Sequence, residues 1–305
     1  MLPSILTFQT VPGGPNLLKG AGFGTVRFVN SGGGGSTTSG GLTPETAFTT
    51  LDSAINASAA NDTIILMPGH SETIAGADGF DADVAGLTII GLGENGQRPT
   101  FTFSATASAC AIGANNVVIE NVRFSAGVSA VVAPLTIEGK TGVVIRNCEF
   151  YWGGTTGWDF VDSIVLSAAS NRCVIEGCRF LAEPAVAGAA TAVKLSGASH
   201  NVKIQNNEFM GDYSTACVNG ITTLSQGLMF LSNYVHNTDA SEPYLEVLTG
   251  TTGIIANTRG LASGATVAAN AVADAMAHCE NFVVNTAGTI AIVKGAGGSP
   301  ALDAD

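Results

Sequence analysis

The 305-residue sequence contains few charged residues and even fewer basic ones, and this scarcity excludes several classes of function. Only 12% of the residues are charged, and 12 Lys and Arg against 24 Asp and Glu give a net charge of −12. Such an acidic chain is not expected to bind nucleic acid or an anionic membrane surface, because both attract positive charge. No apolar run reaches the roughly 18 residues that a membrane span requires. The first segment, MLPSILTFQTVPGG, has no basic residue, so we expect no secretory signal.

The sequence also lacks the cysteine and histidine spacings that metal sites use. Its six cysteines form no CxxC pair, and HExxH is absent, so we expect neither a metal nor another cofactor. Cys148 and Cys178 stand where Val122 stands in a related segment, and Cys173 and Cys279 also fall at positions predicted to face inward. We therefore interpret them as buried, unpaired thiols that pack as small hydrophobic side chains.

One nine-residue segment recurs along the chain. Its best copies read NVVIENVRF, GVVIRNCEF, RCVIEGCRF and NVKIQNNEF, and weaker copies such as GLMFLSNYV and TGIIANTRG follow. The central residues of the aligned copies are Gly91, Asn121, Asn147, Gly177, Asn206, Asn233, Asn257 and Asn281. Successive copies are 24 to 30 residues apart. A repeat of this length, with fixed strands and variable insertions, indicates a solenoid.

The columns of the alignment predict two strands separated by a corner. Before the central Asn, hydrophobic residues alternate with others, as at Val117 and Ile119, which predicts a strand with one buried face. After the Asn the alternation shifts by one residue, so Val122 and Phe124 also face inward. Asn and Gly tolerate the left-handed conformation that such a corner needs. Coils stacked about 4.8 Å apart would align the Asn side chains in a hydrogen-bonded ladder. The prediction is an all-β, right-handed parallel β-helix.

The chain is predicted to consist of one domain and an arm. Residues 1–41 are rich in Gly and Pro and form an extended arm, which is either a disordered terminus or a segment that orders on a partner. Residues 42–305 form a single β-helix domain with coils from about residue 63 to 295. Thr43–Ala59 is predicted to be a helix, because its apolar residues recur at spacings of three and four. An open first coil exposes unpaired backbone, so this helix is expected to cap it.

The predicted helix followed by NDTIILMPGHSETI, and then by coils of the form V-x-I-x-N-x-x-F, resembles the pectate-lyase-like β-helix superfamily. Within it, the sequence is most similar to small β-helix proteins among the structural genes of tailed bacteriophages. The resemblance covers roughly residues 43–282. The superfamily includes polysaccharide lyases, hydrolases, epimerases, phage tailspikes and inert structural proteins, so the fold alone does not select an activity.

The resemblance implies where enzymatic chemistry would be found. Lyases of this superfamily hold Ca²⁺ on clustered carboxylates beside an Arg or Lys base, and its hydrolases use paired or triple Asp. The carboxylates of residues 78–83 suit either a hard cation or a polar turn. Asp159 and Asp162 flank a predicted strand, but no matching carboxylates recur in adjacent coils. We therefore identify no catalytic residue and no metal site.

Charged residues form two columns, one on each side of the corner. The columns contain Glu120, Arg146, Glu176 and Gln205, and Arg123, Glu149, Arg179 and Glu208. Both are predicted to face outward, and each alternates in sign, so that neighbouring coils attract one another. Exposed pairs of this kind contribute only about 0.2–1 kcal/mol each. Their predicted role is to fix the register between coils.

The longest loop, YWGGTTGWDFVD, supplies the candidate binding residues. These are Tyr151, Trp152, Trp158, Asp159 and Asp162. Aromatic side chains on a solenoid stack on sugar rings, but they also pack a loop onto its own coil or onto a neighbouring subunit. The loop is therefore predicted to contact either a glycan or another subunit.

An apolar column is predicted on the outer surface, three residues before each central Asn. It contains Val118, Val144, Val174, Phe230 and Ile254. Soluble monomers seldom expose a continuous apolar stripe, so these residues are predicted to form a subunit interface. We expect a homotrimer with parallel coils side by side, although closed symmetry in general most often gives dimers.

Together these interpretations predict a non-enzymatic phage virion protein, a trimeric capsid decoration or fibre protein on the particle exterior. A length of 305 residues leaves little room for the extra domains of a tailspike, which favours capsid decoration. The expected partners are further copies of the chain, a capsid or other virion protein, and a host-surface polysaccharide. The alternatives are a tailspike-like depolymerase, either a lyase or a hydrolase, and a carbohydrate-binding adhesin that uses the Tyr151–Asp162 loop.

Overall fold

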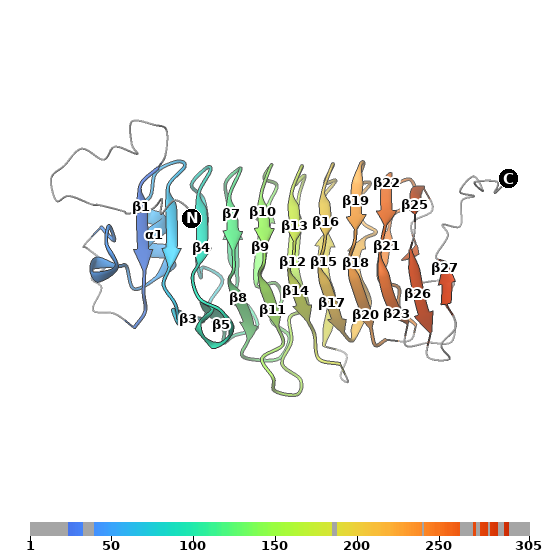
Figure 1. The fold of residues 1–305 in the computed structure, drawn as a ribbon, viewed down its shortest axis with the longest axis horizontal. Coiled ribbons are helices and arrows are strands. Elements are labelled where there is room, and N and C mark those ends of the chain that lie inside the picture. Colours follow the sequence, from blue (N-terminus) through green and yellow to red (C-terminus); the bar gives the residue numbers. More distant parts are fainter. Residues whose placement is uncertain are drawn as a thin grey trace, which may run out of the picture.

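The strands wind into coils that stack along one axis, from the N-terminal end on the left of Figure 1 to the C-terminal end on the right. The computed structural model describes residues 24–32, 40–184, 188–239, 241–262, 271–272, 275–279, 281–285 and 290–292. Within these residues the strands form three sheets, and every pairing except the last is parallel. The predicted parallel β-helix is therefore confirmed.

Each full coil contributes one strand to each sheet. Sheet A contains β1 (Val26–Val29), β2 (Thr63–Leu66), β4 (Thr88–Gly91), β7 (Val118–Glu120), β10 (Val144–Arg146), β13 (Val174–Glu176), β16 (Lys203–Gln205), β19 (Leu228–Leu231), β22 (Gly253–Ala256) and β25 (Met276–Cys279). Sheet B contains β3 (Ser71–Ile74), β5 (Thr100–Phe103), β8 (Arg123–Ala126), β11 (Glu149–Tyr151), β14 (Arg179–Leu181), β17 (Glu208–Gly211), β20 (Tyr234–Asn237), β23 (Arg259–Ala262), β26 (Phe282–Asn285) and β27 (Ile290–Ile292). Sheet C contains β6 (Cys110–Ile112), β9 (Leu135–Glu138), β12 (Asp162–Ser167), β15 (Ala189–Leu195), β18 (Tyr213–Gly220), β21 (Leu245–Val247) and β24 (Ala271–Val272).

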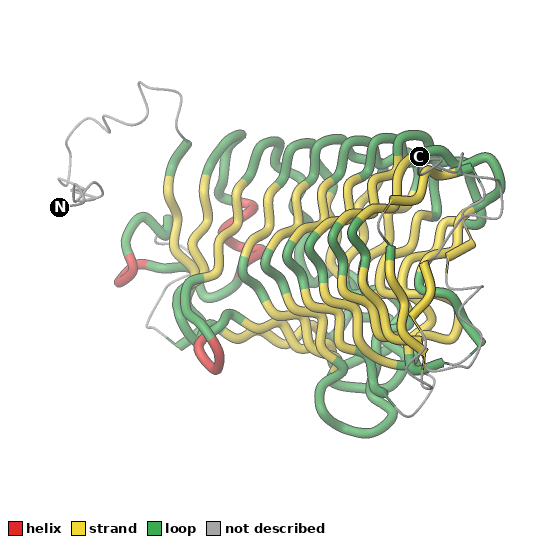
Figure 2. Tube along the Cα trace, turned by 45° about the vertical axis from the view of Figure 1, so that its right-hand side comes forward, coloured by secondary structure: helices red, strands yellow, loops and turns green. Residues whose placement is uncertain are grey.

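The predicted N-terminal helix is much shorter than expected. Within residues 43–59 the structure has a 3-10 turn, η2 (Pro44–Thr46), and a six-residue helix, α1 (Leu51–Asn56). Phe48 is not helical because its backbone pairs with β1, donating to Phe28 O at 2.8 Å. The helical segments, including η3 (Asn95–Gln97), lie toward the N-terminal end of the stack (Figure 2). The helix α1 buries its apolar side in the core and contacts β1 and β2.

The predicted boundary between arm and domain is wrong at residues 24–32. β1 pairs in parallel with β2, so part of the predicted arm is the first strand of sheet A. The remainder of the arm, residues 1–23 and 33–39, lies outside the described residues. At the other end β27 pairs antiparallel with β26 and forms the last described strand, while residues 293–295 of the predicted coils are not described.

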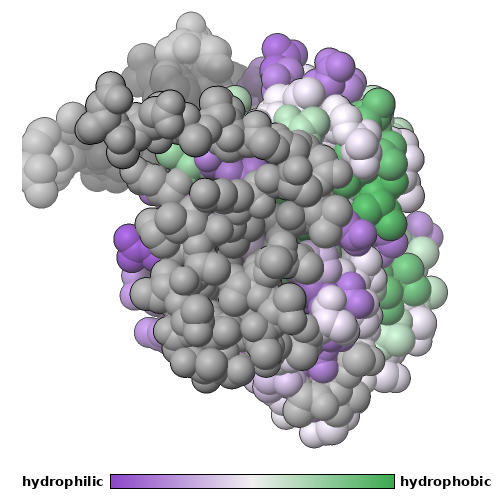
Figure 3. Space-filling model, turned by 90° about the vertical axis from the view of Figure 1, so that its right-hand side faces the viewer, coloured by the Kyte–Doolittle hydropathy of each residue, from purple (hydrophilic) through white to green (hydrophobic). Residues whose placement is uncertain are grey.

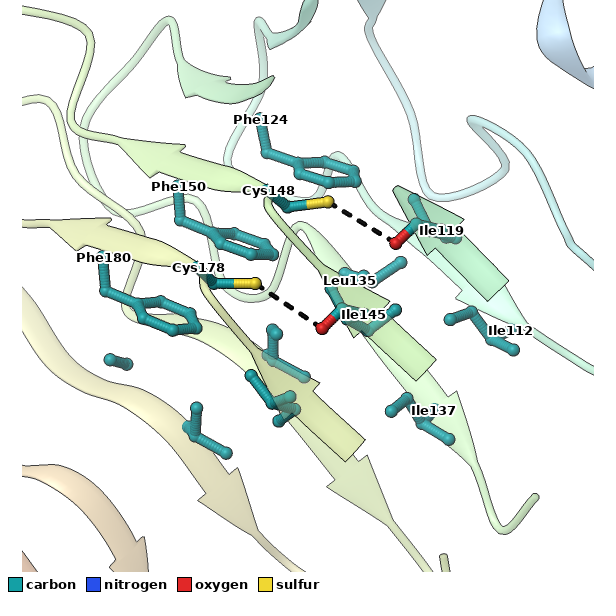
Figure 4. Packing of buried hydrophobic residues seen from close by; sticks show 14 of the residues in the cluster. Ile112, Ile119, Phe124, Leu135, Ile137, Ile145, Cys148, Phe150, Cys178 and Phe180 are labelled. Carbon is teal, nitrogen blue, oxygen red and sulfur yellow. Dashed lines mark hydrogen bonds between the residues drawn. The ribbon is translucent and has the colours of Figure 1, made fainter. Parts of the chain in front are cut away.

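The core consists of columns of identical side chains. Isoleucines pair in register along sheet A, and phenylalanines stack along sheet B with ring centroids 4.9–5.0 Å apart (Figure 4). The two columns include Ile119, Ile145, Ile175 and Ile204, and Phe124, Phe150, Phe180 and Phe209, all of which are buried. Because the phenylalanines pair in register, the distance between their ring centroids is close to the spacing between adjacent strands.

The corners have the predicted left-handed conformation, but their side chains are not the predicted inward ladder. Asn121, Asn147 and Asn206 have φ of 57°, 53° and 55°. However, Asn147 and Asn206 are exposed. The buried ladder lies one residue later, immediately before each strand of sheet B.

That buried column contains Val122, Cys148, Cys178, Asn207, Asn233, Thr258 and Asn281. The Sγ atoms of Cys148 and Cys178 donate to carbonyl oxygens of the preceding coil at 3.7 and 3.6 Å (Figure 4). The Nδ2 atoms of Asn207 and Asn233 donate to equivalent carbonyls at 2.9 Å. Each of these four side chains thus links two coils from inside the solenoid.

The alignment of GLMFLSNYV is wrong by one residue. Ser232, with φ of 54°, forms the corner in place of Asn233, and Ile204 pairs with Phe230. Phe230 is therefore fully buried, which contradicts its predicted place in the outer apolar column. Cys279 is also misplaced, because it pairs with Ala256 and is exposed.

Candidate functional site

Asp159 lies in the loop between β11 and β12, which projects from the lower edge of the solenoid in Figure 1. Its Oδ1 accepts the N–H of Phe160 at 3.0 Å, and its Oδ2 accepts the N–H of Glu183 in the next coil at 3.2 Å. The side chain is only 2% exposed. Burial raises the pKa of Asp159 to about 7, although the two backbone hydrogen bonds act in the opposite direction.

Asp162, at the start of β12, belongs to a different arrangement. Lys194 of β15 donates from Nζ to Asp162 Oδ2 at 2.7 Å. Asp162 is 5% exposed, and its Oδ1 is buried without a hydrogen-bond partner in the described chain. The structure therefore gives Asp159 and Asp162 separate partners on the neighbouring coil.

Polar side chains continue from Lys194 across the outer face of sheet C. Lys194 pairs in register with Asn219 of β18, and Asn219 pairs with Glu246 of β21. The Nδ2 of Asn219 donates to Glu246 Oε2 at 3.3 Å. Lys194 and Glu246 are partly exposed and can bind the hydroxyl groups of an extended polar ligand, whereas Asn219 between them is only 5% exposed.

The aromatic residues of the loop are partly buried and contact the protein itself. The Arg123 guanidinium lies 5.6 Å from the centroid of the Tyr151 ring, within cation–π range. The rings of Tyr151 and Trp152 are tilted, with centroids 5.9 Å apart. Trp158 packs against the hydrophobic core. Packing within the chain, one of the three roles that the sequence leaves open beside a glycan and a neighbouring subunit, accounts for these contacts.

The charged columns are only partly exposed, which corrects the prediction that both face solvent. Glu149 is 5% exposed because the longer arginines beside it in the column cover its carboxylate. Arg123 Nε lies 2.5 Å from Glu149 Oε1, and Arg179 Nη1 lies 3.2 Å from Oε2. Arg98 adds a third guanidinium, whose Nη1 lies 3.9 Å from Glu149 Oε2. The repeat does not predict Arg98, because it follows η3 outside the aligned segment.

A polar groove of about 480 Å³ runs over the corner between sheets A and B. Its lining includes Glu94, Arg98, Glu120, Asn121, Asn147 and Arg179. Glu120 binds Arg146 at 2.7 Å, and Arg179 binds Glu208 at 2.7 Å. Glu120 and Arg179 are neutralised by these partners, so neither presents an unpaired charge to the groove.

The residues of the predicted outer column lie on the outer face of sheet A, except for Phe230. Val118, Val144 and Val174 pair in register, and farther along the sheet Met229 pairs with Ile254. All five are half-buried. Only Lys203 lies between the three valines and the pair formed by Met229 and Ile254. Met229 occupies the position that the sequence assigned to Phe230, because of the one-residue shift described above.

Sequence reasoning missed Glu183 and Lys194 as members of these clusters. Lys194 stands at an outward position of β15, so the alternation of the strand could have predicted that its side chain lies on the outer face. Glu183 lies in a segment without periodicity, and nothing in the sequence indicated its contact with the loop. Among the residues that the structure describes, no group of three or more His, Cys, Asp and Glu is placed to hold a metal ion. No helix in the described part of the chain is long and apolar enough to cross a membrane.

The stacked coils, their asparagine corners and the aromatic core define a right-handed parallel β-helix. Residues 89–272, more than half of the chain, match the family described as "Right handed beta helix region". The chain belongs to that family. No curated protein sequence matches it.

Solved structures give weaker likenesses. The surface adhesin PfbA of Streptococcus pneumoniae is 13% identical, with a TM-score of 0.47 over 75% of this chain and 69% of the adhesin. A rhamnogalacturonan lyase is 15% identical, with a TM-score of 0.45 over 78% of this chain and 69% of the lyase. ORF18 of Geobacillus virus E2 is 14% identical, with a TM-score of 0.44 over 85% of this chain and 61% of that one.

Proposed function

We propose that the chain is a non-enzymatic structural protein on the exterior of a phage virion, and that it assembles as a homotrimer through the outer face of sheet A. The observation that supports assembly is the aliphatic column of sheet A. Three valines on consecutive coils, Val118, Val144 and Val174, face outward in register. Met229 and Ile254 extend the column toward the C-terminal end.

The surroundings of this column favour a protein partner. Beside Val118 and Val144, the charges of Glu120 and Arg146 neutralise each other at 2.7 Å. Desolvating this pair in an interface is less costly than burying either charge alone. The exposed large hydrophobic residues Ile221, Leu224 and Leu248 lie in the segments that lead into β19 and β22. Figure 3, which views the solenoid from its C-terminal end, shows hydrophobic residues gathered on one flank. Such surfaces mark contacts between proteins.

The virion location rests on the resemblance of the repeat to phage β-helix proteins. The non-enzymatic role is supported by the contacts of the two candidate carboxylates. Asp159 accepts backbone N–H groups, and Asp162 binds Lys194, so both have structural partners.

Light scattering on the purified chain tests the assembly. The wild-type protein should contain three subunits, and Val144→Asp should shift it to a monomer while its circular dichroism is unchanged. Val165→Asp is the matched control, because Val165 is a half-buried valine on the outer face of sheet C. A wild-type monomer, or a trimer that tolerates Val144→Asp, would overturn the proposal.

A second experiment tests the virion role. Mass spectrometry of purified phage particles should detect the chain, and immunogold imaging should place it on the exterior. Deleting residues 1–23 preserves β1 and should leave the trimer intact but abolish its binding to capsids. Capsid binding by the truncated chain would contradict a role of the arm in attachment.

The alternative function is binding or degradation of a polysaccharide on sheet C. The row from Lys194 to Glu246 beside Asp162 is the observation that favours it. On the structural proposal, incubation with anionic bacterial polysaccharides and Ca²⁺ yields neither ultraviolet-absorbing unsaturated products nor new reducing ends. Turnover that disappears in Asp162→Asn and in Lys194→Met, with folding preserved, would instead establish a depolymerase.

A further inference from the structure

The loop over residues 152–161 is held to the next coil by two reciprocal contacts. Glu183 Oε2 accepts the N–H of Gly157 at 2.8 Å, and Asp159 Oδ2 accepts the N–H of Glu183 at 3.2 Å. Each coil thus supplies a carboxylate to a backbone N–H of the other. The loop also places Trp158 against the core. These contacts connect the longest loop to an otherwise regular stack.

Both carboxylates of this arrangement are buried. Asp159 is 2% exposed and Glu183 is 5% exposed. Two ionised carboxylates in one buried site repel each other and lose the water that would solvate them. Asp159 accepts backbone N–H groups from Phe160 and Glu183, and Glu183 accepts one from Gly157, but these bonds compensate only part of this cost. A proton on Asp159 therefore favours the closed arrangement.

We propose that Asp159 and Glu183 form a proton-dependent clasp, which holds the loop over residues 152–161 against the next coil at acid pH and loosens as the pH rises toward neutrality. The clasp is independent of trimer assembly and of any catalytic role. Its opening would release Trp158 from the core and make the loop available to a partner.

The direction of the pH dependence follows from the environment of Asp159. Burial raises the pKa of this carboxyl to about 7, and the charges of Glu183 and Asp212 also raise it. In an opened loop Asp159 would have its ordinary pKa of about 3.9. Between these two values the closed loop keeps a proton that the open loop loses. Raising the pH from about 5 to 7 should therefore increase the opening constant roughly fifty-fold, and the increase should level off above about pH 7.

The groups around Asp159 come from three elements. Glu183 follows β14, Asp212 lies between β17 and β18, and the buried phenol of Tyr213 begins β18. On the loop's own side, Asp162 is the next carboxylate along the chain, and its contact is with Lys194. The groups that act most directly on Asp159 are thus acidic, and they favour its protonated form.

Hydrogen exchange on the full-length protein measures the clasp directly. Peptides that contain Gly157 and Glu183 would be followed between pH 5 and 8, with rates corrected for the intrinsic pH dependence of exchange. The wild-type opening constant should rise roughly fifty-fold between pH 5 and 7. In Asp159→Asn, which keeps an oxygen acceptor but cannot ionise, it should be constant. The control Asp78→Asn removes a distant exposed carboxylate and should behave as the wild type.

Tryptophan fluorescence provides a second readout. The chain has two tryptophans, Trp152 and Trp158, and both lie in this loop. In the Trp152→Phe variant, emission from Trp158 reports its burial. It should shift to longer wavelength where hydrogen exchange reports opening.

The wild-type exchange measurement decides the proposal even if a variant fails to fold. Equal corrected protection of Gly157 at pH 5 and pH 7 would overturn it. A rise in opening that Asp159→Asn retains would also overturn it, because another group would then carry the titration.

Discussion

Replacing Asn207 with Leu should destabilise the solenoid strongly, because Asn207 forms the centre of the buried ladder. The residue is 2% exposed. Its Oδ1 accepts the N–H of Cys178 at 2.8 Å, and its Nδ2 donates to Ile175 O at 2.9 Å. Both partners are backbone groups inside the solenoid, where water cannot replace the lost side chain.

The magnitude follows from the two backbone groups that Leu would leave without partners. Each unpaired buried group costs about 1–3 kcal/mol, so the expected loss is about 2–6 kcal/mol before any gain from the added apolar surface. Asn207→Cys should cost about 1–3 kcal/mol, because its thiol can donate to Ile175 O but leaves the N–H of Cys178 without its acceptor. Cysteine occupies the same column at Cys148 and Cys178, where each Sγ donates to the equivalent carbonyl.

Urea denaturation followed by circular dichroism would measure the two variants against the wild type. A solenoid need not unfold in one step, so the midpoint of the first transition should be compared as well as the extrapolated free energy. Asn147→Leu serves as the corner control, because Asn147 is exposed and has φ of 53°. It should lose only the roughly 1–2 kcal/mol that a left-handed conformation costs Leu. A midpoint for Asn207→Leu equal to that of Asn207→Cys would refute the ladder argument.

Three further substitutions test other parts of the fold by the same measurement. Glu149→Gln should destabilise by about 1–3 kcal/mol, because it removes the buried charge that three arginines surround; no measurable change would show that those pairs are solvated. Lys194→Met should cost about 1–3 kcal/mol by leaving Asp162 buried without its cation, and the double variant with Asp162→Asn should recover part of that loss. Gly197→Ala should prevent folding, because a Cβ there would lie 1.8 Å from a backbone oxygen, whereas Gly76→Ala meets nothing within 4 Å and should be neutral.

The sequence predicts the coils well because their signal repeats. Each inward Ile and Phe recurs at the same position in adjacent copies, so the predicted orientation does not depend on the residue at one position alone. The prediction fails where copies weaken. In GLMFLSNYV, Ser232 replaces the corner Asn, and Asn233 follows it. Aligning the copy on Asn233 instead of Ser232 assigned Phe230 to the surface rather than to the core, since a one-residue shift exchanges the two faces of a strand.

The candidate site is less predictable for a different physical reason. Asp159 and Glu183 lie in segments whose length varies from coil to coil, so no column relates one to the other. Their contact depends on how two irregular loops fold against each other, and the sequence repeat of the coils does not determine this. The same holds for Arg98, whose approach to Glu149 comes from the turn after η3. The aromatic residues of the loop were found from their type alone.

The surfaces of the solenoid are separate enough that assembly and the clasp should not affect each other. Val144 lies on the outer face of sheet A, whereas Asp159 lies in the loop that joins sheets B and C. Substitutions at distant sites without shared partners usually have additive effects. The double variant Val144→Asp/Asp159→Asn should therefore be monomeric by light scattering and should show pH-independent protection of Gly157. If the trimer instead covered the loop, Val144→Asp alone would raise exchange at Gly157 at every pH. That outcome would place the loop within the subunit interface, which is one of the two contacts predicted for its candidate binding residues.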